Sequence, residues 1–389
     1  MKFSKNLFHM IEKREIFRIR IKNIFVNLGV LVLSLIIVFI IGEFIVRSLY
    51  KDKTVLFPRY HTDAQYGQFT LRKIRPNSVF WHTSLDGSWK FTINNKGLRN
   101  DSNFEYEKSE GIIRIISLGD SHTQGFEVRQ DYTFSAIIEK YLKAHGHNTE
   151  VINAGISGFS TAEELLFLEN EGIKYKPDFV VLGFYANDFQ DNIKANFFKL
   201  NKNGNLLIQK KQHIPSVKIQ NIIYKLPFVK WLGETSYFYS LLFNNTWNYF
   251  KTRLSKKSSD RVVEYAIPTQ DKFSDYKIAL TSALIQRMYK FCYNNNIKLI
   301  IIDIPTIAEK NQFKTSFSES LSENIANYSD GYILSNSLLA EYRGIAEIHR
   351  PHGQRHISEF THTLLGIAAA KKISSLIQEW QQNDCSKDL

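Results

Sequence analysis

A short apolar strand that ends in Gly-Asp-Ser-His constrains this chain more than any other feature. Residues 112–118 read Ile-Ile-Arg-Ile-Ile-Ser-Leu, and Gly119-Asp120-Ser121-His122 follow directly. A β-branched run of this length is typical of a strand buried on both faces. The glycine lets the backbone turn sharply after the strand. The pattern therefore predicts a strand that turns into a helix and presents the Ser121 hydroxyl at its end.

The same alternation of strand and helix continues along the chain. Short apolar stretches predict strands, and amphipathic stretches with capping residues predict helices. The predicted strands cover residues 151–153, 179–183 and 298–303, and the predicted helices cover 134–143, 161–170 and 358–380. Apolar strands that alternate with helices predict a parallel sheet covered on both faces. We therefore expect an α/β domain over residues 111–380.

Near the N-terminus, residues 24–46 are apolar apart from Asn27, Ser34 and Glu43. Their length fits a helix that crosses a hydrocarbon core of ~30 Å. The tail at residues 1–23 carries seven Lys and Arg residues, and the positive-inside rule places such a tail in the cytoplasm. The sequence thus predicts a single-pass protein of the inner or plasma membrane whose main domain lies outside the cytoplasm.

Two further segments differ in composition and pattern from the alternating strands and helices. Residues 50–110 are rich in aromatic and turn-forming residues, and residues 88–93 alternate in polarity before the turn signal at 94–97. This segment predicts a β-rich lead-in with a hairpin. Residues from about 195 to 275 interrupt the strand–helix rhythm and contain many aromatic residues between 224 and 250. We expect a helical insertion there, whose aromatic side chains pack on the core, form a lid or glycan-stacking surface, or lie on the membrane.

Charge, cysteine spacing and histidine placement limit the kinds of ligand that this chain is expected to bind. The formal charge of +12 is compatible with nucleic-acid binding, but no known binding motif accompanies it, so no nucleic acid is expected. Cys292 and Cys385 lie far apart and form no zinc-binding pair. The four histidines between residues 349 and 362 fall in a segment that Pro351 and Gly353 predict to be a loop, without carboxylates at ligand spacing. We therefore expect no metal and no cofactor.

The ends of the predicted strands carry residues suited to acyl transfer. Binding sites in parallel sheets form beyond the carboxyl ends of the strands, where Ser121, residues 153–158 and residues 183–188 would meet. Acyl transfer needs a nucleophile, a base and donors aimed at an oxyanion. Ser121 suits the first role, and a late histidine suits the second. The backbone N–H groups of Ser121 and Gly158 with the amide of Asn187 suit the third, while Asp120 is expected to hold the turn.

These segments resemble three of the four sequence blocks of the SGNH/GDSL hydrolase family. The matching blocks read GDSHTQG at 119–125, NAGISG at 153–158 and GFYAND at 183–188. The resemblance implies a flavodoxin-like three-layer α/β/α sandwich with Ser121 as nucleophile and His356 as base. It implies Gly158 and Asn187 as oxyanion donors.

Membrane-tethered members of the family often act on acylated polysaccharides outside the cytoplasm. The resemblance therefore implies a membrane-anchored serine esterase that hydrolyses or transfers O-acyl groups, such as O-acetyl, on a small molecule or a polysaccharide. Two alternatives stay open: a polysaccharide O-acetyltransferase, and a glycan-binding or assembly protein whose catalytic residues have decayed.

The fourth block departs from the family pattern. The family has an Asp two or three residues before the histidine, where this chain has Gln354 and Gly353. Loss of the corresponding carboxylate in a serine protease lowers turnover by about 10⁴. Gln354 or a backbone carbonyl is one candidate to orient His356 instead.

The acid and the base each have further candidates. A carboxylate from elsewhere in the chain can take the place of the missing Asp, and Glu359, Glu347 and Asp303 are the candidates. For the base, His352 is an alternative to His356, which would then have a different role.

Overall fold

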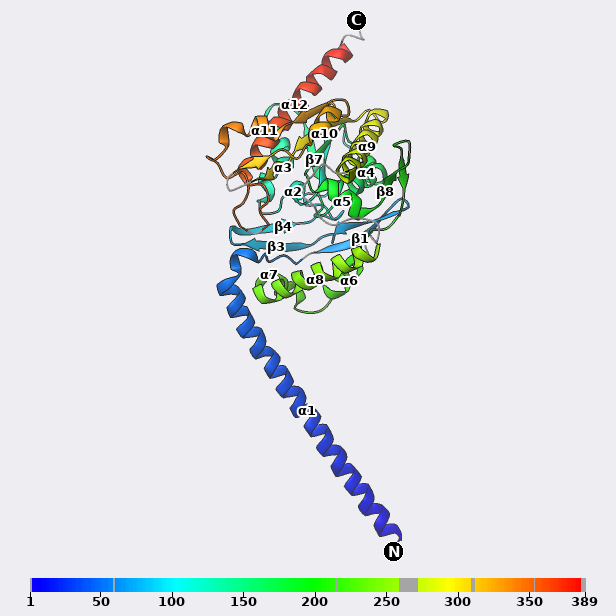
Figure 1. Cartoon of the computed structure of the whole chain (residues 1–389), viewed down its shortest axis with the longest axis vertical. Helices are drawn as coiled ribbons and strands as arrows, with labels where there is room; N and C mark the ends of the chain where they lie inside the picture. Colours follow the sequence, from blue (N-terminus) through cyan, green and yellow to red (C-terminus); the bar gives the residue numbers. More distant parts are fainter. Residues whose placement is uncertain are drawn as a thin grey trace.

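The computed structural model describes residues 2–58, 60–213, 216–258, 272–308, 312–352 and 354–385. A long helix, α1 (Lys2–Leu49), projects from a body built around a central sheet (Figure 1). The C-terminus of the chain lies at the opposite end of the molecule from the N-terminus (Figure 1).

The central sheet has five parallel strands. They are β5 (Ile113–Gly119), β6 (Thr149–Asn153), β7 (Phe179–Phe184), β10 (Lys298–Asp303) and β13 (Gly331–Ile333). Their order across the sheet is β13-β10-β7-β5-β6, which is the doubly wound order of flavodoxin-like folds with its switch point between β5 and β7. The predicted α/β fold with a parallel sheet is confirmed. The short edge strand β13 was not predicted.

Helices cover both faces of this sheet. On one face, Ile116 and Leu118 of β5 pack into a core that includes residues of α4 (Thr161–Asn170) and α9 (Lys272–Asn294). On the other face, Ile115 packs with residues of α3 (Phe134–Ala144) and α12 (Glu359–Cys385). Successive strand residues point to opposite faces, so the mostly apolar run of β5 is the expected composition of a strand buried on both sides.

Two antiparallel hairpins lie across the end of the sheet nearer α1 (Figure 1). They are formed by β1 (His61–Tyr66) with β2 (Phe69–Ile74), and by β3 (Val79–Ser84) with β4 (Gly87–Thr92). The expected turn at 94–97 follows β4 but joins no second strand among the described residues. The Asn94 side chain accepts hydrogen bonds from the N–H groups of Lys96 and Leu98, and this Asx-type turn redirects the chain toward β5.

The insertion differs from the expected all-helical segment in how it begins. A hairpin of β8 (Phe198–Leu200) and β9 (Leu206–Ile208) comes first. Three helices follow, α6 (Ser216–Ile223), α7 (Val229–Thr235) and α8 (Tyr237–Ser258). They form a layer beneath the β1–β2 and β3–β4 hairpins (Figure 1). Residues 259–271 of the insertion lie outside the described residues.

The remaining elements are short. They are η1 (Lys51–Lys53), α2 (Ser121–Gln124), η2 (Gln130–Tyr132), η3 (Gly172–Tyr175), α5 (Asp188–Ala195), β11 (Thr306–Ile307), β12 (Phe313–Lys314), α10 (Glu319–Ile325), α11 (Ser335–Leu338) and η4 (Ala340–Tyr342).

Helix α1 runs without a break through the predicted boundary between tail and span at residue 23. Its segment Phe17–Leu49 is long and apolar enough to cross a membrane by length and composition, and a signal sequence has the same properties. The expected division into tail, span, lead-in and hydrolase domain stays a prediction.

Candidate active site

Ser121 is the first residue of α2, directly beyond the carboxyl end of β5. The turn depends on Gly119, whose φ is +152° and whose absent side chain leaves room for Thr123 Oγ1, only 1.9 Å from where a Cβ would lie. Asp120 caps the helix, because its Oδ1 accepts the N–H of His122 at 2.8 Å. Strand, glycine turn and cap together hold the Ser121 hydroxyl at the switch point of the sheet.

His356 lies against Ser121 although the two residues are far apart in the sequence. Nε2 of His356 is 2.8 Å from Oγ of Ser121, which is the distance that a general base needs to accept the hydroxyl proton. His356 precedes α12 and is buried. Its ring contacts the rings of His122 and Phe126, with centroids 4.6 and 5.3 Å away. The imidazole therefore has one fixed position facing the hydroxyl.

A buried carboxylate that sequence reasoning did not select lies on the other side of His356. Oε2 of Glu127 is 3.5 Å from Nδ1 of His356 and accepts the backbone N–H of His356 at 3.1 Å. Oε1 accepts the backbone N–H of Gln354 at 2.9 Å. Burial by itself raises the pKa of Glu127, but hydrogen bonds and charge from His356 and His82 outweigh burial and hold that pKa well below its ordinary value. Glu127 is thus an anion placed to orient His356.

The loop that carries Glu127 is held by a buried arginine. Arg99 donates from Nη1 to the carbonyls of Gln124 and Gly125 and from Nη2 to that of Val128, at 2.9 Å for Gln124 and Val128. Burial lowers the pKa of Arg99 to about 9, so it stays charged at neutral pH. Glu127 itself has φ +60°, a left-handed conformation that is uncommon outside glycine. The fork of Arg99 fixes the backbone on both sides of that residue.

The lead-in also contributes a side chain to the site. His82 of β3 is fully buried, and its Nε2 is 3.8 Å from Oε1 of Glu127. Burial lowers the pKa of His82, and Glu127 opposes that shift. Four side chains therefore form a row through the site, in the order His82, Glu127, His356 and Ser121. His82 comes from outside the α/β domain.

The candidate oxyanion donors also gather at this edge. Asn187 follows β7, and its Nδ2 donates to Oδ2 of Asp120 at 3.0 Å, which leaves its second amide hydrogen for a ligand. Among the described residues, the N–H groups of Ser121 and Gly158 have no hydrogen-bond acceptor within the chain. Burial raises the pKa of Asp120. Through its hydrogen bonds to His122 and Asn187, Asp120 joins the turn of Ser121 to the loop of Asn187.

Gly158 is held by Arg72 of β2. Its φ is +76°, and the guanidinium of Arg72 lies 2.9 Å from where a Cβ would stand. Arg72 Nη2 donates to the Gly158 carbonyl and lies 3.8 Å from Oε1 of Glu163. This contact holds the carbonyl of the residue whose N–H is a candidate oxyanion donor, so the first hairpin lies directly against the donor loop.

The other candidates for the acid or base pair with groups other than the Ser121 hydroxyl or the His356 ring. His352 pairs through Nδ1 with Oδ1 of Asp86, at 2.7 Å, in the turn of the β3–β4 hairpin. Gln354 is exposed and donates only its backbone N–H toward the site. Each expected carboxylate has partners elsewhere, since Glu359 pairs with Arg129, Glu347 with Arg350, and Asp303 accepts from Thr315, Ser316 and Ser335.

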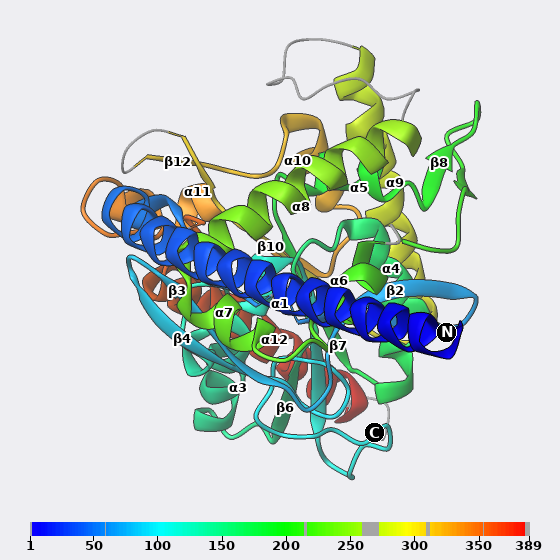
Figure 2. The ribbon, with the colours of Figure 1, turned by 90° about the horizontal axis from the view of Figure 1, so that it is seen from below.

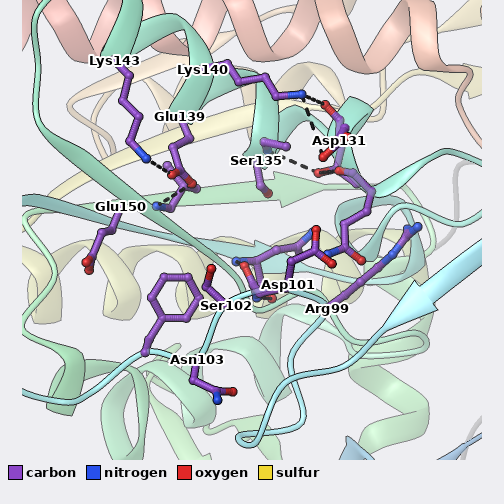
Figure 3. Close-up of a pocket in the computed structure, with 17 residues that line it drawn as sticks. Arg99, Asp101, Ser102, Asn103, Asp131, Ser135, Glu139, Lys140, Lys143 and Glu150 are labelled. Carbon is purple, nitrogen blue, oxygen red and sulfur yellow. Dashed lines mark hydrogen bonds and ion pairs between the residues drawn. The ribbon is translucent and has the colours of Figure 1, made fainter. Parts of the chain in front are cut away.

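A cavity of about 410 Å³ lies at the β6 edge of the sheet (Figure 3). It is lined by the loop after β4, by η2 and α3, and by the end of β6, with charges of both signs. Lys143 pairs with Glu139, and Lys140 lies 4.0 Å from Asp131 (Figure 3). Neither Ser121 nor His356 lines it, so it is separate from the candidate site. No group of three or more His, Cys, Asp or Glu residues suited to a metal ion occurs in the part of the chain that the structure describes.

Comparisons with known proteins found similar sequences and structures. An arylesterase from Vibrio mimicus is 30% identical over 80 residues, which cover 21% of this chain and 40% of that relative. The match thus spans less than half of the relative's length.

Similar solved structures include the lipase/acylhydrolase from Enterococcus faecalis, with 18% identity and a TM-score of 0.39 over 68% of this chain and 96% of that one. A catalytic mutant of Axe2, an acetylxylan esterase from Geobacillus stearothermophilus, has 14% identity and a TM-score of 0.36 over 69% and 96%.

Residues 117–268 match the model of the GDSL-like Lipase/Acylhydrolase family. That segment begins inside β5 and contains Ser121, Gly158 and Asn187. This segment of the chain is therefore similar to the GDSL-like lipase/acylhydrolase family.

Proposed function

We propose that the chain is a serine esterase that hydrolyses or transfers an O-acyl group through an acyl-Ser121 intermediate. The observation that carries this proposal is the 2.8 Å contact between Oγ of Ser121 and Nε2 of His356, with Glu127 on the far side of the imidazole. The family match and the similarity to an arylesterase support the same class of reaction.

In the first half of the proposed reaction, Oγ of Ser121 attacks the carbonyl carbon of the ester while Nε2 of His356 takes the hydroxyl proton. The oxyanion is bound by the N–H groups of Ser121 and Gly158 and by Nδ2 of Asn187. The intermediate collapses when the C–O bond to the alcohol breaks and His356 returns the proton to the leaving oxygen. Glu127 stabilises the imidazolium that exists between these two proton transfers.

In the second half, an oxygen nucleophile attacks the acyl-serine, and His356 again takes the proton and returns it to Oγ of Ser121. Water as nucleophile gives hydrolysis, whereas a sugar hydroxyl gives transfer, so both reactions use the same residues. We propose an O-acylated molecule such as an O-acetylated polysaccharide as substrate. Glu127 supplies the carboxylate that the fourth sequence block lacks, which removes the main reason to regard the site as decayed.

We further propose that α1 crosses the inner or plasma membrane and holds the enzyme outside the cytoplasm. The apolar length of Phe17–Leu49 and the basic N-terminal tail support this topology. A C-terminal alkaline phosphatase fusion is expected to be active. An inactive fusion in membranes that contain the full-length chain would contradict external placement.

The catalytic proposal is tested by hydrolysis of p-nitrophenyl acetate by the full chain in detergent. Ser121→Ala should abolish hydrolysis, and Ser157→Ala, at a serine that has no hydrogen bond to His356 among the described contacts, should retain it. Equal rates for the wild type and Ser121→Ala would overturn the proposal. Adding a sugar acceptor separates the two reactions, because a transferase diverts the acyl group from water to the sugar.

A further inference from the structure

Helices α6, α7 and α8 and the turn between α6 and α7 carry a set of large apolar side chains that face away from the body of the protein. The helices lie between the hairpins and the side from which α1 projects, and α1 passes across α7 in the view from below (Figures 1 and 2). We call the set the apolar surface. Its members are 50 to 76% exposed, and they are Ile219, Ile222, Leu226, Phe228, Trp231, Leu242 and Tyr249.

The opposite side of this layer is in contact with the β3–β4 hairpin and with the segment that leads into β1. Tyr224 stacks on Tyr60, with ring centroids 5.3 Å apart. Gly233 lies against Pro58, and the backbone N–H of Trp81 donates to Glu234 at 3.1 Å. Because these contacts fix which face of the layer packs on the protein, the exposed apolar side chains belong to its outer face.

An exposed apolar patch of this kind marks an interaction surface rather than ordinary surface. Ile219 and Ile222 are three residues apart on α6, and Leu242 and Tyr249 are seven apart on α8, spacings that place each pair on one side of its helix. Trp and Phe among aliphatic residues are the side chains that amphipathic helices bury at the boundary between headgroups and acyl chains.

The layer is joined directly to the candidate membrane helix, so a lipid bilayer is the partner that the apolar surface would meet. Glu43 of α1 accepts from Oγ of Ser236 at 2.7 Å and from the N–H groups of Tyr237 and Phe238 at 3.1 and 2.9 Å, so it caps the start of α8. Arg47 pairs with Glu43 and donates to the Thr235 carbonyl at 3.0 Å.

Apolar contacts reinforce this junction. Phe39 and Phe238 pack edge to face with ring centroids 5.6 Å apart, and Val46 and Tyr237 share a buried cluster. The last turns of the apolar helix are thus fixed to the layer rather than linked to it by a flexible segment.

The charge around the junction also fits a lipid bilayer as the partner. Exposed basic side chains lie at the end of α1, in η1, after α6 and in α7, and they are Arg47, Lys51, Lys53, Lys225 and Lys230, which outnumber the one exposed carboxylate of η1, Asp52. Basic residues that border an apolar surface attract the anionic headgroups of a bilayer. A bilayer crossed by α1 would therefore meet the apolar surface at the depth where α1 leaves it.

We propose that the apolar surface is seated in the headgroup region of the bilayer that α1 crosses. The α/β domain then rests on the membrane in one orientation instead of moving on a tether. This inference rests on the proposed membrane span, and it is independent of the proposed chemistry at Ser121.

The test uses the full chain with Cys385 replaced by serine and a single environment-sensitive fluorophore on an introduced cysteine, reconstituted in anionic vesicles. Lipids with a nitroxide just below the headgroups quench shallow fluorophores, and lipids with a nitroxide near the ends of the acyl chains quench deep ones, so both kinds of lipid are used. The label at Ile222→Cys should be quenched severalfold. The matched control is Tyr293→Cys, which is 70% exposed at the end of α9, just before the N-terminal edge of β10, and its label should not be quenched.

A third label, at Leu33→Cys in α1, separates the two proposals. Quenching at Leu33 without quenching at Ile222 would overturn the seated surface and leave the span standing. Loss of quenching at both sites would overturn both proposals. Protection of the Ile222 label without lipid quenching, together with energy transfer between differently labelled copies, would assign the surface to a second copy of the chain and also overturn the inference.

Discussion

Oε2 of Glu127 lies 3.5 Å from Nδ1 of His356 and also accepts the backbone N–H of that residue at 3.1 Å. One carboxylate oxygen therefore contacts both the ring and the main chain of the candidate base. Its other oxygen is occupied by the N–H of Gln354. This geometry ties the loop that follows α2 to the loop that precedes α12, and it places an anion where the fourth sequence block provides none.

Glu127→Gln should lower turnover by about 10³–10⁴-fold, because the amide neither stabilises the imidazolium nor fixes its tautomer. KM should change much less. Glu127→Asp keeps the charge and tolerates the left-handed conformation, so it should recover part of the lost turnover. Steady-state kinetics on a soluble aryl ester measure both parameters.

Glu359→Gln is the matched control for that substitution. Glu359 is also a carboxylate near His356 in the sequence, but it pairs with Arg129 at 2.6 Å. Turnover of this variant should stay close to that of the wild type. A large loss in Glu359→Gln together with normal turnover in Glu127→Gln would assign the orienting carboxylate to Glu359 instead.

Asn187→Ala should lower kcat by about 10²–10³-fold, the usual cost of removing one oxyanion donor. Asn187→Asp should be at least as impaired, because it sets a carboxylate beside Asp120 and the developing oxyanion. Circular dichroism establishes that both variants fold. Wild-type kcat in either folded variant would exclude Asn187 from the oxyanion site.

Arg99→Lys should destabilise the fold by about 2–4 kcal/mol, because an ammonium cannot reproduce a fork that donates to several buried carbonyls. The loop that carries Glu127 depends on those bonds, so turnover should fall as well. Denaturant unfolding measures the first effect and ester hydrolysis the second. Unchanged stability would mean that the carbonyls find other donors.

The buried His362 predicts a loss of stability in acid. Its Nδ1 accepts the N–H of Phe134 at 3.1 Å, and burial lowers its pKa to about 3. The unfolded histidine titrates near ~6.5. Between these values the unfolded chain binds the extra proton, so stability falls as pH drops, by up to about 1.4 kcal/mol per pH unit for this group.

His362→Asn offers an amide oxygen to the same N–H and does not titrate. Its unfolding free energy should therefore depend less steeply on pH than that of the wild type between neutral pH and about pH 4. His349, whose pKa burial lowers to about 4, keeps part of the slope in both proteins. Parallel slopes would show that His362 is not the titrating group.

Sequence patterns located the strands that carry the site, because buried parallel strands are continuous apolar runs. The runs at 112–118, 179–183 and 298–303 correspond to β5, β7 and β10. The edge strand β13 has only three residues, and a run that short carries no distinctive period.

The contributions of Glu127 and His82 depend on contacts between distant segments. Glu127 follows α2, whereas His82 belongs to a hairpin that comes earlier in the chain. The available signal was a carboxylate between two apolar residues, Phe126 and Val128. Such a residue is buried only when the chain supplies partners for it, and here those partners come from the β3–β4 hairpin that precedes the domain and from the loop that precedes α12.

The most direct test of the central claim is covalent labelling of the full chain by a fluorophosphonate, which reacts with an activated serine whatever the natural substrate. We predict that peptide mass spectrometry finds the phosphonate on Ser121, that Ser121→Ala is unlabelled, and that His356→Ala and Glu127→Gln label far more slowly than the wild type. Labelling of Ser121→Ala at the wild-type rate, or no labelling of the folded wild-type chain, would contradict the account.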